Sequence, residues 1–318
     1  MDRYDLVLGM AQTNYLGLAE HLLLMQAGHC HWSSLARAVN TPMSALRTVG
    51  GQEIYATFYY IEERFPDHAL PNTFQLDDSL AFAVFLRGFK GIAVESETVF
   101  DRVARLEDWL ATAPTRISTP DKMTFPYVRM ATIFITPDGG NSRLKVASPA
   151  GVDFSGLPLL PNDENPYQMT RQAKDTLDLG LLDDWTEDRA HASPDVIHAI
   201  DIDRDTNGAG IVYFANYVAF MNRAERETID AMPAMPPASA AGPKAVRVVQ
   251  QRRIAYFGNA STSDRIHTRV RVFRRDSETS KIAFRYEMRR EEDGELICLS
   301  EAIKVLREPP VRAPAHGD

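Results

Sequence analysis

The two halves of the 318-residue chain share one order of predicted elements, and this repeat restricts the fold more than any other feature. Each half has a stretch with helical spacing of apolar residues, followed by four runs that are β-rich or alternate in polarity. The helices are predicted over residues 17–39 and 212–229, and the strands over 54–62, 80–86, 92–98, 128–135, 246–257, 266–272, 282–288 and 297–306. A long helix packed against antiparallel strands is an α+β unit.

The repeat extends to individual residues. Residues 18–20 (Leu-Ala-Glu) align with residues 214–216 (Phe-Ala-Asn), at the same spacing that relates Met25 to Met221. Asp78 and Asp264 each precede an alternating run, and a difference in loop length accounts for their slightly shorter spacing. We infer an internal duplication of a helix-plus-sheet unit.

A segment rich in proline and glycine separates the two halves. It has few apolar runs, and we expect it to lie over the surface as a connection rather than as a packed element. The predicted organisation is therefore a first module over residues 1–140, a linker over 141–189, a second module over 190–307 and a loose tail over 308–318.

The composition excludes several classes of protein. The formal net charge is −8, and nucleic-acid binding needs a basic surface to neutralise phosphates. Cys30 and Cys298 are two widely separated thiols, too few for a disulfide framework. The sequence has neither a leader-like N-terminus nor an apolar run of the roughly 20 residues that cross a bilayer. A cytoplasmic protein without a membrane partner is expected.

The strongest local signal is the run from Asp205 to Tyr217, in which an Asn-Gly-Ala-Gly turn (207–210) precedes the second predicted helix. Free backbone N–H groups at a helix start favour a group that becomes negative, such as a thioester oxygen during reaction. The alternative is a glycine loop before a helix with no chemical role.

The longer run resembles the hot-dog acyl-CoA thioesterases of the 4-hydroxybenzoyl-CoA type. The resemblance implies that Asn207 stands where those enzymes carry their catalytic carboxylate, and that Phe214 replaces a histidine. Asparagine is no general base, although its amide donates hydrogen bonds. Asn207 is thus a candidate catalytic hydrogen-bond donor, and Gly208, Gly210 and Asn216 are candidate substrate-binding residues.

A second resemblance covers most of the chain, including the linker. It rests on the order and spacing of short clusters at residues 9–10, 17–32, 54–60, 146–151, 156–161, 205–217 and 256–259. Together these are similar to the double hot-dog acyltransferase/decarboxylase family, whose best-known member acts in leinamycin biosynthesis. The resemblance implies two tandem hot-dog modules that decarboxylate methylmalonyl-CoA and deliver a propionyl group to the phosphopantetheine thiol of an acyl carrier protein.

The same resemblance implies a catalytic tyrosine in the first module's aromatic run, at Tyr60. A phenol there donates to an enolate oxygen, protonates the α-carbon or carries the acyl group, and these roles stay open. In a regular strand Tyr59 and Tyr60 point to opposite faces, so that only one of them lines a pocket. A shift of one residue in the alignment with the family moves the catalytic assignment to Tyr59. The alternative for Tyr60 is a core aromatic.

Four further residues are weaker candidates. Glu20 and His21 lie on the first predicted helix, where hot-dog enzymes often place an acid or base; the alternative for Glu20 is a structural pair. Arg252 and Arg253 are expected to form a surface pair, with coenzyme phosphates as the alternative ligand. His29 and His31 diverge on a helix, so no metal site is expected. No cofactor is expected beyond the CoA thioester substrate.

Two other functions remain open at this stage. One is a hot-dog thioesterase or dehydratase that uses a carboxylate of the first module, such as Glu20. The other is a non-catalytic acyl-binding partner in a biosynthetic assembly. Two covalently joined hot dogs mimic the usual dimer of single ones, so a monomer is feasible and a homodimer stays open.

Overall fold

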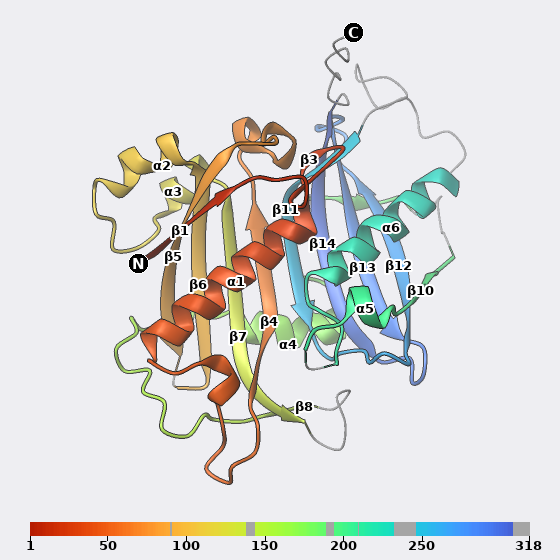
Figure 1. The fold of residues 1–318 in the computed structure, drawn as a ribbon. Helices are drawn as coiled ribbons and strands as arrows, with labels where there is room; N and C mark the ends of the chain where they lie inside the picture. The colour runs from red at the N-terminus through yellow and green to blue at the C-terminus, as the bar shows by residue number, and fades with distance from the viewer. Residues whose placement is uncertain (90, 138–143, 189–193, 209, 232–245, 308–318) are drawn as a thin grey trace, which may run out of the picture.

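A computed structural model describes residues 1–89, 91–137, 144–188, 194–208, 210–231 and 246–307. Its centre is one antiparallel sheet with the strand order β1-β5-β6-β7-β4-β11-β14-β13-β12-β10 (Figure 1). The first five of these strands are β1 (Asp2–Val7), β4 (Tyr55–Arg64), β5 (Ser79–Phe89), β6 (Ala93–Arg102) and β7 (Tyr127–Pro137). The other five are β10 (Val196–Ala199), β11 (Val246–Tyr256), β12 (Arg265–Arg274), β13 (Lys281–Arg290) and β14 (Leu296–Arg307).

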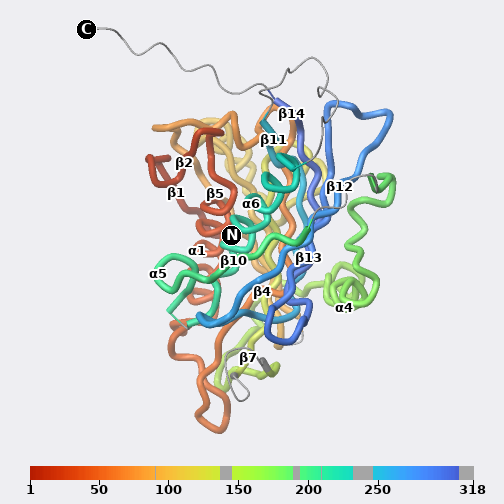
Figure 2. The backbone as a smooth tube through the Cα atoms, turned by 90° about the vertical axis from the view of Figure 1, so that its right-hand side faces the viewer, coloured from red at the N-terminus to blue at the C-terminus, as the bar shows by residue number. Residues whose placement is uncertain are grey.

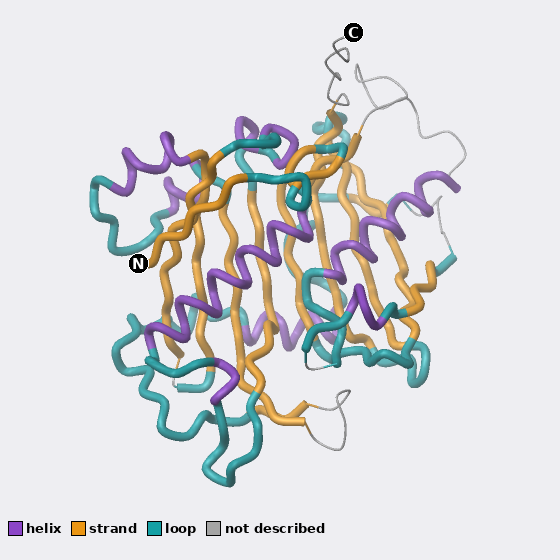
Figure 3. The backbone as a smooth tube through the Cα atoms, in the orientation of Figure 1, coloured by secondary structure: helices purple, strands orange, loops and turns teal. Residues whose placement is uncertain are grey.

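Two long helices lie side by side on one face of this sheet (Figure 3). They are α1 (Glu20–Ala38) over the first five strands and α6 (Asn216–Ala231) over the second five. The order of strands around α1 is repeated around α6, with β10 in the place of β1. The predicted double hot-dog fold, two modules that each wrap a long helix in an antiparallel sheet, is therefore confirmed.

The residue-level repeat is visible at the entrance to equivalent strands. The Asp78 carboxylate accepts a hydrogen bond from the Gln75 backbone N–H at 2.9 Å, just before β5. The Asp264 carboxylate accepts one from the Ser261 N–H at 2.7 Å, just before β12. The same turn thus precedes the same strand in both modules, as an internal duplication requires.

The helix starts differ from the sequence prediction. The first helix begins at Glu20, because Gly17 and Leu18 pair as β3 (Gly17–Leu18) with β2 (Thr13–Asn14). The second begins at Asn216 rather than at residue 212, because the Val212 N–H donates to the Ala260 carbonyl. In both modules a short extended segment therefore leads into the helix.

Further helices lie on the opposite face of the sheet, where Figure 2 shows α4 (Tyr167–Thr176). On the same face α2 (Val103–Leu110) buries Leu106 beside Ala81 and Ala83, and α3 (Thr119–Thr124) follows α2. Two short strands extend the sheet itself: β8 (Leu144–Val146) pairs with β7, and β9 (Thr186–Glu187) pairs with β12. The short helix α5 (Ile202–Asp205) precedes α6. Short 3-10 turns occupy Met43–Ala45, Asp67–Ala69 and Pro71–Thr73. The expectation of a linker without packed elements is wrong, because α4 buries Ala173 against the sheet beside Ala255 and Leu299. Its few apolar residues gave too weak a period to predict a helix.

The module boundaries stay a prediction. Residues 138–143 and 189–193, on which two of the proposed boundaries fall, lie outside the described residues, and so does the proposed tail at 308–318. The predicted loop at residues 232–243 also lies outside them. Among the described residues no helix is long and apolar enough to cross a membrane.

The two modules meet where β4 pairs with β11, over Tyr60–Arg64 and Gln251–Ala255. Each of these strands has one extra residue relative to the strand that it pairs with inside its own module. The extra residue is Tyr59 where β4 pairs with β7, and Gln250 where β11 pairs with β14. Such a β-bulge bends the strand and re-aims its side chains. Tyr59 and Gln250 therefore occupy equivalent positions in the repeat, and the regular alternation expected at Tyr59 and Tyr60 is wrong.

A buried histidine ties α1 to the sheet of the first module. The His31 ring lies 2.7 Å from the Ser96 hydroxyl through Nδ1 and 3.1 Å from the Thr132 hydroxyl through Nε2. Burial lowers the pKa of His31 from 6.5 to about 3, because a charged imidazolium has no water there. The imidazole is therefore neutral in the folded protein.

This pKa predicts a loss of stability in mild acid. Protonation of His31 favours the unfolded chain as the pH falls below 6.5. The stability that neutral His31 contributes is therefore fully present above pH 6.5 and is lost progressively as the pH falls toward about 3. Between about pH 7.5 and about pH 5 we expect His31 to account for roughly 2 kcal/mol of lost unfolding free energy. Urea titrations of the wild type and His31→Gln at both pH values measure this share. Equal losses in the two proteins would contradict it.

Candidate functional site

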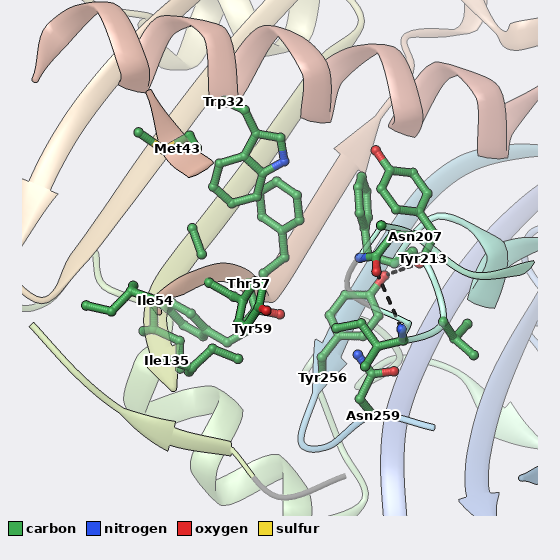
Figure 4. Close-up of a pocket in the computed structure, with 18 of the residues that line it drawn as sticks. Trp32, Met43, Ile54, Thr57, Tyr59, Ile135, Asn207, Tyr213, Tyr256 and Asn259 are labelled. Carbon is green, nitrogen blue, oxygen red and sulfur yellow. Dashed lines mark hydrogen bonds between the residues drawn. The ribbon is translucent and has the colours of Figure 1, made fainter. Parts of the chain in front are cut away.

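A cavity of about 650 Å³ opens where β4 and β11 part from each other (Figure 4). Beyond their paired stretch, residues 54–59 of the first module and 256–259 of the second form facing walls. The loop before α6 closes the helix side with Asn207, Gly208 and residues 211–214. Both modules thus contribute to one site, as the covalent pairing of two hot dogs allows.

Aromatic rings form the end of the cavity nearest to α1. Phe58 of β4 packs against Trp32 of α1 and against Phe214, with ring centres 4.6 Å apart in both pairs. A side chain at Gly28 would leave no room for this arrangement, since a Cβ there would stand 2.7 Å from the Phe214 ring. Phe214 is therefore part of an apolar wall.

The turn before α6 places Asn207 at the cavity. The Asn207 N–H donates to the Ile211 carbonyl and the Gly210 N–H donates to the Asn207 carbonyl, both at 2.9 Å. Gly210 has φ +72°, a conformation that glycine adopts without strain. Gly208 lines the cavity and has open space around its Cα. The structure thus brings Asn207 and Gly208 to the site, and Gly210 supports their turn.

Several phenol groups line the same cavity. The Tyr59 hydroxyl donates to the Asn165 side-chain carbonyl at 3.0 Å, and the Tyr256 hydroxyl donates to the Phe214 carbonyl at 2.9 Å. The half-buried Tyr213 hydroxyl makes no hydrogen bond to any residue in the described part of the chain. Burial raises the pKa of Tyr59 and of Tyr213 above the ordinary value, so both phenols are protonated donors at neutral pH.

Tyr60 does not line the cavity. It is 1% exposed, and its hydroxyl donates to the Glu62 carboxylate at 3.2 Å. Its neighbours are Ala131 and Met169, the latter on α4, behind the sheet. A catalytic role for Tyr60 stays a prediction, whereas the bulge brings its neighbour Tyr59 to the cavity wall.

The remaining sequence candidates lie away from this cavity. The Asn216 side-chain amide donates to the carbonyls of Arg204 and Asp205 at 3.1 and 3.2 Å, which holds the start of α6 against the preceding loop. Glu20 and His21 line a second cavity of about 350 Å³ at the start of α1. Of the residues proposed from the sequence, Asn207 and Gly208 line the first cavity and Glu20 and His21 line the second. Tyr60 and Asn216 line neither.

The expectation that Arg252 and Arg253 form a surface pair is wrong for Arg252. Its side chain is fully buried, with Nε 2.5 Å from the Glu20 carboxylate and 3.5 Å from that of Glu63. Residues 252 and 253 alternate across β11, and Arg252 faces the two helices, where its guanidinium contacts Glu20 of α1 and Met221 and Asn222 of α6. Arg253 is partly exposed and lies 3.6 Å from Glu62.

This buried cluster fixes the charge of Glu20. Although burial acts in the opposite direction, Arg252, a proton shared with Glu63 and the Lys304 charge lower the pKa of Glu20 to about 2. Burial and the charge of Glu20 raise the pKa of Glu63 well above its usual range. We assign the negative charge to Glu20, because Asn222 also donates to it at 3.1 Å. A carboxylate held this way is a poor proton acceptor.

Some lining residues were missed by sequence reasoning. Trp32 and Tyr213 lie within the quoted clusters 17–32 and 205–217, but neither was proposed as a site residue, and only the fold brings them together. Asn259 belongs to the quoted cluster at residues 256–259, and it accepts a hydrogen bond from the Tyr217 hydroxyl at 3.0 Å. The position of Asn259 opposite the turn of Asn207 could not be predicted from the sequence, because it depends on how the two modules pair.

The sheet order, the two central helices and the shared cavity define a double hot-dog protein. More particularly, residues 12–179 match the family described as the LnmK N-terminal Hot Dog Fold domain, and the chain belongs to this family. The match covers more than half of the chain and includes α1, β4 and the following segment up to Leu179. No curated protein sequence matches the chain.

Solved structures of similar fold include two thioesterases. An acyl-ACP thioesterase from Bacteroides thetaiotaomicron is 10% identical, with a TM-score of 0.56 over 95% of this chain and 97% of that one. A 12:0-ACP thioesterase from Umbellularia californica is 9% identical, with a TM-score of 0.59 over 96% and 94% of the two chains. At this level of identity the likeness concerns the fold, and it extends over both modules.

Proposed function

We propose that this protein decarboxylates a methylmalonyl-type CoA thioester and transfers the resulting propionyl-like group to the phosphopantetheine thiol of an acyl carrier protein. The observation that carries the proposal is the kind of group that lines the main cavity. Among the described residues its only carboxylate is Glu53, whose side chain is 62% exposed and lies 3.3 Å from Arg47. The lining offers aromatic rings, phenols and an amide, and no imidazole.

Such a lining suits loss of CO2 better than hydrolysis. Hydrolysis of a thioester needs a base or nucleophile to activate water or attack the carbonyl, whereas a carboxylate in an apolar site loses CO2 when the enolate that forms is stabilised. The bond between the carboxylate and the α-carbon breaks, its electron pair forms the enolate, and CO2 leaves. Asn207 is the proposed donor to the enolate oxygen.

Tyr59 is the proposed proton donor to the α-carbon. Its raised pKa keeps the phenol protonated, and its hydrogen bond to Asn165 orients the ring. Entry of the thioester releases the hydroxyl from Asn165 toward the substrate, and the phenol regains a proton from water afterwards. The carrier thiol then attacks the thioester carbonyl, the bond to the CoA sulfur breaks, and CoA leaves as its thiol. Membership of the hot-dog family matched by residues 12–179 supports a reaction on a thioester.

The proposal is tested with purified protein, methylmalonyl-CoA and a holo carrier protein. We expect the mass of the carrier to increase by one propionyl group, with release of one CO2 for each group transferred. Carrier protein in its apo form, which lacks the thiol, is the control and should stay unmodified. A carrier that gains no mass, in a reaction that also releases no CO2, would overturn both halves of the proposal.

A further inference from the structure

We propose that the second cavity, of about 350 Å³ at the start of α1, is a binding site for a short-chain organic carboxylate. The internal repeat explains why a cavity exists there. The first cavity lies between the start of α6 and the bulge of β4, and the second lies between the start of α1 and the strand β11 beside its bulge. The two cavities are therefore equivalent places on opposite sides of the junction between the modules.

The aromatic wall of the first cavity is aliphatic in the second. Leu18 stands in the repeat position of Phe214, and Val249, which precedes the bulge at Gln250, stands in that of Phe58. Val248 and Pro71 extend this apolar surface. Smaller side chains leave a cavity that is about half as large and that fits a short aliphatic group rather than an acyl-pantetheine arm.

The opposite wall is charged, and cations are in excess. Three cationic side chains line it, Arg226, Arg247 and Lys304, against the two carboxylates of Glu20 and Glu225. Both carboxylates are already neutralised within the protein. The Glu225 carboxylate lies 2.7 Å from Arg247 and 2.6 Å from Lys304, and Glu20 is paired with the buried Arg252.

Arg226 is the cation left to meet a ligand. It is exposed on α6 and makes no hydrogen bond or ion pair with any residue in the described ranges. His21 lies at the same cavity, and burial lowers its pKa, so a neutral imidazole is available as a further hydrogen-bonding group. A guanidinium binds a carboxylate through two parallel hydrogen bonds.

The combination of these walls selects the class of ligand. An aliphatic surface opposite the Arg226 guanidinium suits a small molecule with an apolar end and a single negative charge. An inorganic dianion such as sulfate would gain nothing from Leu18 and Val249, and the single charge of Arg226 would balance only half of its own charge. This site does not depend on the reaction proposed for the first cavity.

The test is a ligand-observed NMR titration of the full chain with propionate, repeated with sulfate as a competitor at equal ionic strength. We expect saturable binding of propionate that Arg226→Gln weakens about tenfold, the effect of losing one charged hydrogen-bonding partner. Arg223→Gln is the matched control, because Arg223 lies on the same helix but pairs with Glu227 at 2.7 Å and does not line the cavity. This control should bind propionate within about twofold of the wild type.

Three results would overturn the proposal. The first is the absence of saturable propionate binding to the wild type. The second is weakening by Arg47→Gln at the mouth of the first cavity with no effect of Arg226→Gln, which would place propionate there instead. The third is sulfate binding as tight as that of propionate, which would make the site one for inorganic anions.

Discussion

Arg252→Met is expected to lower the free energy of unfolding by about 3–5 kcal/mol, the largest loss that we predict for a single substitution. Arg252 is fully buried and is the cation closest to Glu20, at 2.5 Å. Methionine fills a similar volume but leaves the Glu20 carboxylate without its main counter-charge at the junction of the modules. Chemical unfolding of both proteins at neutral pH measures the difference.

The neighbouring residue supplies the control. Arg253→Met removes a partly exposed guanidinium that lies 3.6 Å from Glu62 and donates to the Leu179 carbonyl. We expect a loss of about 1 kcal/mol there, because solvent screens the ion pair. Similar losses in the two variants would show that the buried cluster contributes no more than a surface pair.

The deficit of Arg252→Met should also depend on pH. Arg252 holds the pKa of Glu20 at about 2 in the folded protein, below the ordinary 4.5. A depressed carboxyl pKa adds stability above pH 4.5, and that stability is lost as the pH falls toward about 2. The difference between wild type and variant should therefore narrow in acid. A constant difference from neutral pH to about pH 3 would contradict the charge assigned to Glu20.

Tyr59→Phe is expected to slow acyl transfer to the carrier by about 10²–10³-fold with little change in stability. The substitution removes only the hydroxyl, so the ring remains at the cavity wall and the proposed proton donor is lost. The hydrogen bond to Asn165 is lost as well, at a cost of about 1 kcal/mol. Initial rates of carrier acylation with saturating thioester measure the effect.

Tyr60→Phe is the matched control, one residue along β4. Its hydroxyl contacts Glu62 and lies outside the cavity, so transfer should fall less than about threefold. A large loss in Tyr60→Phe with a normal rate in Tyr59→Phe would return the catalytic role to Tyr60. A large loss in Tyr213→Phe alone would assign proton donation to Tyr213 on the loop before α6.

The general fold was predictable from the sequence because its signals are local and repeated. Alternating residues such as Leu80, Phe82 and Val84 do face the core under the helices, as their period of two predicts. Strand β1 was missed, because its exposed residues alternate with only half-buried ones. The same weakness hid α4, which buries little more than Ala173 and Thr170.

The site was only partly predictable, because its geometry depends on how the modules pair. The glycine turn at Asn207 carries a local signature, and the structure places it at the cavity. Tyr59 rather than Tyr60 lines the cavity because of a β-bulge, and the period of the aromatic run does not predict a bulge. Arg252 resembles any arginine of an alternating strand, and its burial follows from the packing of α1 and α6 over β11.

The most direct test of the central claim follows the acyl group itself. In one reaction with methylmalonyl-CoA and holo carrier protein, the amounts of acylated carrier and of free acid are measured over time. Because the described lining of the main cavity holds no base positioned to activate water, we predict that nearly all of the acyl group appears on the carrier. Free acid should form no faster than without the protein. Free acid released at the same rate with and without carrier would contradict the account and identify a hydrolase.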